Sequence, residues 1–294
     1  METTQDTPEI VFRAPRRLAC AEVALLLEAV GLRAVVQEIG DECLVIVAPH
    51  EAARARHEID AWLAENRARP EPPPRQPLAG GLRGVAGYAL VVVLVALAVA
   101  NLAFDRDWLA AGGIDGAAMR AGEWWRALTA LTLHADVAHL AANVFFGGLF
   151  GGFSGRYLGS GVAWLLILLA GAAGNIVNVL VLGPGHRAIG ASTAVFAALG
   201  LLGSLGWAGR RRSVQGWLYR FGPIVAAVAL LAFTGSGGER TDVGAHLWGF
   251  AAGLGAGWLA AFIPRAVLLR AAVQGAAGLL AVGALAAAWA LALT

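Results

Sequence analysis

The chain has 294 residues, of which 58% are hydrophobic and only 14% are charged, with a formal net charge of +2. Soluble globular proteins carry about 25% charged residues, so this composition argues against a soluble protein and indicates a membrane protein. The arginines form no basic patch interleaved with aromatic residues, which argues against nucleic acid as a partner.

Residues 1–69 predict a small α+β domain on the cytoplasmic side. Strand and helix patterns follow one another in the order β-α-β-β-α, at residues 10–12, 18–30, 33–39, 43–47 and 51–66. The first helix ends at Gly31, a residue that favours helix C-termini. A domain this short has a marginal core and contains no catalytic constellation, so we expect a regulatory or docking role.

The two cysteines, Cys20 and Cys43, both lie in this domain. Neither has a Cys-x-x-Cys partner or a nearby histidine cluster, so they predict a structural, reduced pair. No apolar segment follows a basic N-terminus, and we therefore expect no cleavable signal peptide. Residues 70–83 predict a linker, because prolines favour an extended, semi-rigid spacer.

Long apolar runs in the rest of the chain predict membrane-spanning helices, each of which needs about 20 apolar residues. We expect seven spans, at residues 85–104, 135–153, 162–182, 190–205, 217–233, 243–263 and 271–293. Residues 105–131 form a mixed loop with several tryptophans, which favour the membrane interface. The predicted fold class is an all-α polytopic membrane bundle, with a six-helix core at residues 84–264 and an additional C-terminal span at residues 265–294.

The arginines predict the orientation, because cytoplasmic loops carry an excess of positive charge. With the N-terminal domain inside, the inner side holds the larger set: Arg75, Arg83, Arg156, Arg210, Arg211, Arg212, Arg220, Arg265 and Arg270. The outer side then holds Arg106, Arg120, Arg126, Arg187 and Arg240. We therefore expect a multi-pass protein of the cell inner (plasma) membrane, with a cytoplasmic N-terminus and an outer C-terminus.

Polar residues within the spans need a reason, because polar groups inside a bilayer are costly. The prominent ones are His139 and Asn143 on the second span, Ser192 on the fourth and His246 on the sixth. The topology places all of them near the outer ends of their helices, about 5–10 Å deep for a helical rise of about 1.5 Å per residue. Such agreement in depth is what a single site requires.

A stripe of small residues predicts how the sixth span approaches the fourth. Gly249, Gly253 and Gly257 continue the column that His246 begins, and such a stripe lets two helices pack with their backbones close. His246 would then reach Ser192, and a serine beside a histidine is an activated nucleophile. The two donors on the second span share one helix face and would stabilise the oxyanion of an acyl transfer.

Each of these residues also has an interpretation without chemistry. A serine near a helix end commonly bonds the preceding backbone turn, and a lone histidine in a span is more often a packed hydrogen-bonding group. Asp242, one turn before His246, either orients that histidine or caps the helix, and we favour the cap. Zinc is disfavoured, because His134 and His139 lie about 140° apart on a helix and His-Glu-x-x-His is absent. We expect no metal and no cofactor.

The motifs around these residues resemble those of the rhomboid family of intramembrane serine proteases. They are Glu123-Trp124-Trp125-Arg126, His139-x-x-x-Asn143, Gly190-Ala191-Ser192 and Ala245-His246-x-x-Gly249-x-x-x-Gly253. Their order and spacing fit the family across residues 84–264. The N-terminal domain is similar to the small cytoplasmic domain of some bacterial members, and the seventh span to their six-plus-one arrangement.

The resemblance implies roles for individual residues. Ser192 would be the nucleophile and His246 the general base, while His139, Asn143 and the Ser192 backbone N–H would form the oxyanion hole. Substrate binding or gating would involve Gly190 and Thr193, together with the lid loop after the fifth span, with Gly235 and Gly237. The family's usual motif is Gly-x-Ser-Gly, and here Thr193 replaces the last glycine, which bears on substrate preference and rate.

The sequence therefore predicts a serine endopeptidase that cuts transmembrane segments of other proteins near the outer membrane face. Its partners are transmembrane protein substrates and the lipid bilayer. One alternative is a catalytically inactive relative that binds membrane helices, although both Ser192 and His246 are retained. A second is a transporter that uses the histidine and asparagine cluster as a path, although we find no clear internal repeat.

Overall fold

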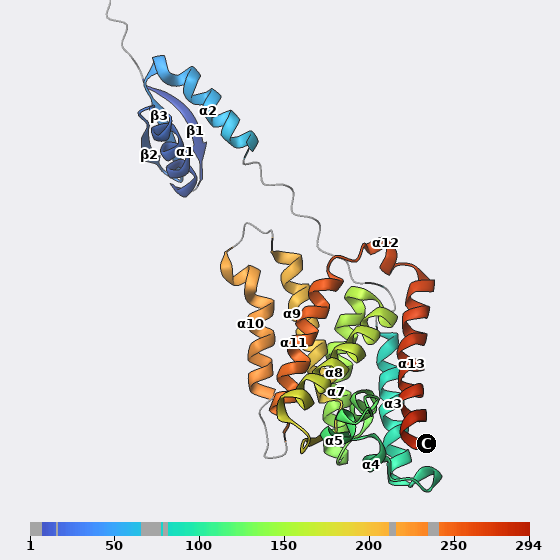
Figure 1. Cartoon of the computed structure of the whole chain (residues 1–294). Helices are drawn as coiled ribbons and strands as arrows, with labels where there is room; N and C mark the ends of the chain where they lie inside the picture. Colours follow the sequence, from blue (N-terminus) through green and yellow to red (C-terminus); the bar gives the residue numbers. More distant parts are fainter. Residues whose placement is uncertain (1–7, 16, 66–77, 79–81, 212–215, 235–240) are drawn as a thin grey trace, which may run out of the picture. The chain divides into compact units, whose positions relative to one another are not determined.

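The computed structural model describes residues 8–15, 17–65, 78, 82–211, 216–234 and 241–294. It divides the chain into two compact units, residues 1–71 and residues 72–294. Figure 1 shows that strands and two helices build the first unit and that helices dominate the second. Most of the linker predicted at residues 70–83 lies outside the described residues.

The first unit has the predicted order of elements. These are β1 (Glu9–Ala14), α1 (Arg17–Ala29), β2 (Val35–Ile39), β3 (Glu42–Val47), a 3-10 turn η1 (Pro49–Glu51) and α2 (Ala52–Glu65). The sheet is antiparallel in the order β1-β3-β2. The predicted helix stop is confirmed, because Gly31 has φ 80° and its neighbour Leu32 donates to the carbonyl of Leu27 at 2.8 Å, the bond that ends a helix at a left-handed glycine.

Both cysteines lie in the core of this unit. Cys20 and Cys43 are free and buried, and the Cys20 thiol donates a hydrogen bond of 3.0 Å to the Cys43 carbonyl oxygen. Burial, together with the contact to Cys43, raises the pKa of the Cys20 thiol to about 11. A neutral, enclosed thiol is unreactive, which agrees with the predicted structural, reduced pair.

The second unit is a helical bundle, and its long helices match the predicted spans. They are α3 (Arg83–Ala100), α7 (Val137–Leu158), α8 (Ser160–Leu182), α9 (Ser192–Arg210), α10 (Trp217–Thr234), α11 (Val243–Ala260) and α13 (Ala271–Leu293). Within the described residues, six helices are long and apolar enough to cross a membrane. The remaining predicted span, α11, has the same length as α3 but is not among these six helices.

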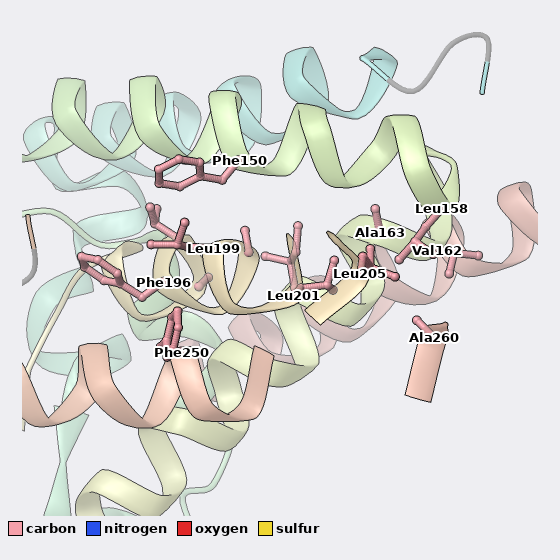
Figure 2. Packing of buried hydrophobic residues seen from close by; sticks show 14 of the residues in the cluster. Phe150, Leu158, Val162, Ala163, Phe196, Leu199, Leu201, Leu205, Phe250 and Ala260 are labelled. Carbon is pink, nitrogen blue, oxygen red and sulfur yellow. The ribbon is translucent and has the colours of Figure 1, made fainter. Parts of the chain in front are cut away.

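Helix α9 lies at the centre of this bundle. In the most apolar 18-residue stretch of α9, 67% of the residues are buried, against 6% in α10 and 11% in α3. Helix α9 is therefore enclosed, while α10 and α3 lie at the periphery. Figure 2 shows the apolar side chains of α9, with Phe150 of α7 on one side and Phe250 of α11 on the other. The residue that begins α9 is Ser192, and its position is therefore fixed by the core.

Glycines allow α11 to lie against α9 with the two backbones in contact. A Cβ atom on Gly253 would overlap the carbonyl oxygen of Ala197, and one on Gly257 would lie 2.6 Å from that of Leu201. A Cβ on Gly249 would likewise overlap the Thr193 carbonyl. The small-residue stripe predicted from the sequence is thus confirmed as the contact between the helix of His246 and the helix of Ser192.

The last helix, α13, is fastened to the bundle near both of its ends. Near its beginning, the Gln274 side chain accepts from the Val162 backbone N–H at 3.2 Å and donates to the Leu158 carbonyl at 2.8 Å. Near its end, the Trp289 indole N–H donates to the Thr132 hydroxyl at 3.1 Å. Figure 1 places the C-terminus at the same end of the bundle as α4 (Trp108–Gly112).

The tryptophan-containing loop predicted between the first two spans is folded. It contains η2 (Ala103–Asp105), α4, β4 (Ile114–Asp115), α5 (Gly116–Arg120), α6 (Arg126–Thr129) and η3 (Ala130–Thr132). Strand β4 pairs with β5 (Arg187–Ala188), just before the helix of Ser192. The Arg126 side chain donates to the carbonyls of Ala110 and Gly113 at 2.8 and 2.9 Å and pairs with Glu123 at 2.6 Å. A short helix α12 (Arg265–Leu268) precedes α13.

We expect the change Gly253→Ala to destabilise the bundle by about 1–3 kcal/mol, the usual cost of overpacking, because the new methyl group would overlap the α9 backbone. Gly255→Ala is the matched control on the same helix, since a Cβ there meets nothing within 4 Å, and it should gain up to about 1 kcal/mol of helix propensity. Thermal unfolding in detergent would measure both changes. Equal unfolding temperatures for the two variants would contradict the close α9–α11 contact.

Candidate active site

The predicted polar residues line one cavity. It has a volume of about 830 Å³ and is bordered by the first turns of α7, α9 and α11, the end of α10 and the segment before α9. Its lining includes all four predicted polar residues, namely His139, Asn143, Ser192 and His246. The structure thus brings these residues, which span more than a hundred positions of the sequence, around one space.

Ser192 opens α9 two residues after a glycine in an unusual conformation. Gly190 has φ 138°, and its backbone N–H donates to the Ala130 carbonyl at 3.0 Å. A Cβ atom at Gly190 would lie 2.9 Å from Nε2 of His139 and 3.5 Å from Oγ of Ser192. A side chain at position 190 would be strained and would occupy the space between these two groups, so glycine is required there.

His139 is oriented by the residues at the start of α7. Asp136 caps the helix by accepting from the His139 backbone N–H at 2.8 Å. The Ala135 N–H donates to Nδ1 of the imidazole at 3.5 Å, a long hydrogen bond. When Nδ1 accepts, the proton of the neutral ring lies on Nε2, which is the atom beside Gly190. His139 can therefore act as a hydrogen-bond donor toward the space next to Ser192.

Asn143 lies one turn further along α7 and is held from two sides. Its side-chain amide nitrogen donates to the His139 backbone carbonyl at 3.0 Å. The backbone carbonyl of Asn143 accepts from the Tyr88 hydroxyl of α3 at 2.9 Å. The side chain is buried and lines the cavity. An amide nitrogen carries two hydrogens, so one hydrogen remains for a ligand in the cavity.

His246 lies in the first turns of α11 and is buried. Its ring packs on Phe196 of α9, with ring centroids 4.3 Å apart and an interplanar angle of 39°. Phe196 follows Ser192 by four positions, so the two project from one face of α9. Phe196 also lines the cavity. Phe196 was not among the residues predicted from the sequence, although its four-residue spacing from Ser192 indicates a shared helix face.

Asp242 has the favoured role of a helix cap. Its side chain accepts from the Ala245 backbone N–H at 2.9 Å, which satisfies one of the open donors at the start of α11. The same carboxylate also contacts Asn178 and His186. Neither partner was predicted to have a positional role.

Thr193 lies outside the cavity. It is buried, and its methyl carbon would be 3.0 Å from a Cβ on Gly174 of α8 and 2.9 Å from a Cβ on Gly249 of α11. The threonine that replaces the family's glycine thus fills a crossing of three helices. Gly235 and Gly237, the predicted gating glycines, lie outside the described residues.

A metal-binding cluster is not found in the part of the chain that the structure describes, where no three His, Cys, Asp or Glu side chains gather. The rings of His134 and His139 are neighbours, with centroids 5.2 Å apart in an edge-on arrangement. Both ring nitrogens of His134 are buried without a hydrogen-bond partner among the described residues.

Comparison with known proteins gives a family for the region around this cavity. Residues 121–262 match the family model of the Rhomboid domain. A stretch of 94 residues, 32% of this chain, is 39% identical to the rhomboid protease GluP of Bacillus subtilis and covers 18% of that protein. Another of 90 residues, 30% of this chain, is 36% identical to the chloroplastic rhomboid-like protein 11 of Arabidopsis thaliana and covers 32% of it. The matches thus span about a third or less of these relatives.

The environment of His134 predicts a pH dependence of stability. Burial, followed by the neighbouring His139, lowers the pKa of His134 from 6.5 to about 4. The unfolded chain takes up this proton near pH 6.5 and the folded chain only near pH 4, so stability falls as the pH is lowered through this window. The loss is at most about 3 kcal/mol, at about 1.4 kcal/mol per pH unit.

Thermal unfolding of the wild type and of His134→Leu between pH 7 and pH 4 would measure this effect. Leucine has a similar volume and no proton to bind, so the difference in stability between the two proteins should change across the window. A constant difference at all pH values would contradict the prediction.

Proposed function

We propose that the chain is a serine endopeptidase with a Ser192–His246 dyad, because residues 121–262 match the Rhomboid domain that the motifs resemble. The long apolar helices and the match to this domain support a multi-pass membrane protein related to the intramembrane proteases. The observation that carries the proposal is the cavity shared by Ser192, His246, His139 and Asn143.

The proposed reaction is an acyl transfer in two stages. The Oγ atom of Ser192 attacks the carbonyl carbon of the scissile peptide bond, and His246 takes the hydroxyl proton. His246 then gives this proton to the leaving nitrogen as the C–N bond breaks. Water attacks the resulting ester, His246 accepts a proton from the water, and Oγ of Ser192 leaves and regains the proton.

The proposed oxyanion hole uses donors from two helices. The Nε2–H of His139 and the second amide hydrogen of Asn143 come from α7. The backbone N–H of Ser192 belongs to the first turn of α9, where the N–H groups have no partner within the helix and the helix dipole favours negative charge. Donors of this kind stabilise charge that develops in the transition state.

The substrate is proposed to be the transmembrane segment of another protein. Peptide bonds inside a regular helix are shielded by their own hydrogen bonds, so we expect Gly or Pro near the cut, where the helix is destabilised. The lining of the cavity combines charged side chains at Asp136, Arg187 and Asp242 with apolar ones. Such a lining suits both the water that hydrolysis consumes and an unwound apolar segment.

Access to the cavity is proposed to run past the end of α10. Thr234 at the end of α10 and Thr241 before α11 both line the cavity, so the segment between them, with Gly235 and Gly237, begins and ends at the site. We propose that this segment serves as the lid, that Gly190 shapes the substrate-binding region directly, and that Thr193 acts on this region only through the packing beside Ser192.

The placement in the cell is part of the proposal. We propose that the protein lies in the inner (plasma) membrane with its N-terminus in the cytoplasm and its C-terminus outside, so that cleavage occurs near the outer face. Residues 1–69 would then form a cytoplasmic domain with a regulatory or docking role, joined by the linker at residues 70–83 to the protease core at residues 84–264. Residues 265–294 would add the last span.

We expect Ser192→Ala and His246→Ala each to abolish cleavage of a model single-span substrate. A fluorophosphonate probe should label the wild type at Ser192 and label neither variant. Ser204→Ala is the matched control, because Ser204 lies in the same helix, donates to the Leu254 carbonyl at 2.7 Å and is not among the residues that line the cavity. Retained cleavage by Ser192→Ala or His246→Ala would rule out the dyad, whereas an unlabelled wild type would favour a non-catalytic helix-binding protein.

We expect His139→Ala and Asn143→Ala each to lower kcat by about 10²–10³-fold, the usual effect of losing one oxyanion donor. KM should change little, because the charge develops only in the transition state. Asn175→Ala is the control for a lost buried amide, since Asn175 donates to the Ala127 carbonyl at 3.0 Å and does not line the cavity. A rise in KM with unchanged kcat would contradict an oxyanion role.

A further inference from the structure

A cluster of polar side chains beside the cavity joins three segments of the chain. The carboxylate of Asp242 accepts hydrogen bonds from the side-chain amide nitrogen of Asn178, at 2.8 Å to Oδ2 and 3.1 Å to Oδ1. Nε2 of His186 lies 3.0 Å from Oδ2 of Asp242 and 3.1 Å from the Asn178 nitrogen. Oδ1 of Asp242 also accepts from the Ala245 N–H. The carboxylate therefore does more than cap α11.

The segments joined by this cluster are those that present the proposed dyad. Asn178 lies in the last turns of α8. His186 lies between α8 and α9, just before β5, and its carbonyl accepts from the Gly116 N–H at 2.9 Å. Asp242 precedes His246 by four positions, and His186 precedes Ser192 by six. The cluster thus ties the chain that leads into Ser192 to the first turn of the helix that carries His246.

The interior part of the cluster is closely fitted. Asn178 is 1% exposed, and a Cβ on Gly244 would lie 2.5 Å from its Oδ1 atom. That oxygen has no hydrogen-bond partner among the described residues, a state that costs free energy. The amide nevertheless keeps its nitrogen toward Asp242, because the opposite orientation would set an oxygen against the carboxylate. The side chains of His186 and Asp242 are 13% and 21% exposed.

The glycine contact between α9 and α11 does not reach the turn of His246. The stripe begins at Gly249, nearly one turn further along α11, and continues away from the cavity. The cavity itself borders the first turn of α11. Contact between the two backbones therefore fixes α11 from Gly249 onward. The hydrogen bonds of Asp242 constrain the first turn of α11 from the side of α8.

We propose that Asn178 and His186 are positioning residues, which act through Asp242 to hold His246 at the distance and angle at which it takes the proton of Ser192. This inference rests on the proposed proteolytic function. A misplacement of about 1 Å at a reacting group can cost about 100-fold in rate, so a small rotation of the first turn of α11 lowers kcat while substrate binding and global stability persist.

Asp242→Asn separates the cap from the cluster. Asparagine caps helices about as well as aspartate, but its NH2 group cannot accept from Asn178 and His186. We expect kcat to fall by about 10- to 100-fold, with KM and the unfolding temperature little changed. Asp107→Asn is the matched control, because Asp107 caps α4 by accepting from the Ala110 N–H at 2.9 Å and lies outside the cavity lining, so it should leave kcat unchanged.

The histidine position offers a rescue test. His186→Leu removes the donor and should lower kcat by a similar factor, while His186→Gln keeps an amide N–H for Asp242 and should recover most of the rate. The double variant His186→Leu/Asp242→Asn should be no slower than the slower single variant, because both changes break one network. Multiplying effects, or equal loss in His186→Gln and His186→Leu, would overturn the positioning role.

Fluorophosphonate labelling separates failure of this inference from failure of the proposed function. A wild type that does not label at Ser192 would overturn the proposed function and this inference with it. A wild type that labels, with Asp242→Asn and His186→Leu labelling at the same rate, would overturn the inference alone. Rates that fall only in proportion to a loss of folded protein would also overturn it.

Discussion

The backbone contact between α9 and α11 is the constraint on which the rest of the second unit depends. Gly249, Gly253 and Gly257 each face a backbone oxygen of α9 where a Cβ atom would not fit. In a bilayer the lipid is as apolar as the side chains, so helices associate through close packing and hydrogen bonds. This contact fixes the relative depth of the two helices, and with it the depth of Ser192 relative to His246.

The cavity lies where three helices begin, which explains how a polar site exists in an apolar bundle. The first N–H groups of a helix lack partners inside the helix, and Asp136 and Asp242 accept from such groups at the starts of α7 and α11. The start of α9 at Ser192 has no side-chain cap, so the N–H groups of its first turn are not taken up by a capping side chain. Capping and the proposed chemistry thus use the same feature of helix ends.

The sequence predicted the features that depend on local spacing, and missed those that depend on contacts across the chain. Long apolar runs located the spans, a single glycine located the stop at Gly31, and helical spacing of small residues located the stripe on α11. A criterion of length and hydropathy alone leaves out α11, the helix that carries His246, whereas the stripe of small residues identifies it. No local pattern joins Asn178 to Asp242, or Gln274 to Leu158, because each pair meets only after the helices pack.

Thr193 shows how a departure from a family pattern is absorbed by packing. Its methyl group would crowd a side chain on either neighbouring helix, and both neighbours, Gly174 and Gly249, are glycines. The extra volume relative to glycine therefore lies at the crossing of α8, α9 and α11, and the side chain does not line the cavity. Because a buried side chain in a close-packed core resists displacement, Thr193 stiffens the support beneath Ser192. The backbone N–H proposed for the oxyanion hole is thereby held by the same crossing that sets the distance between α9 and α11.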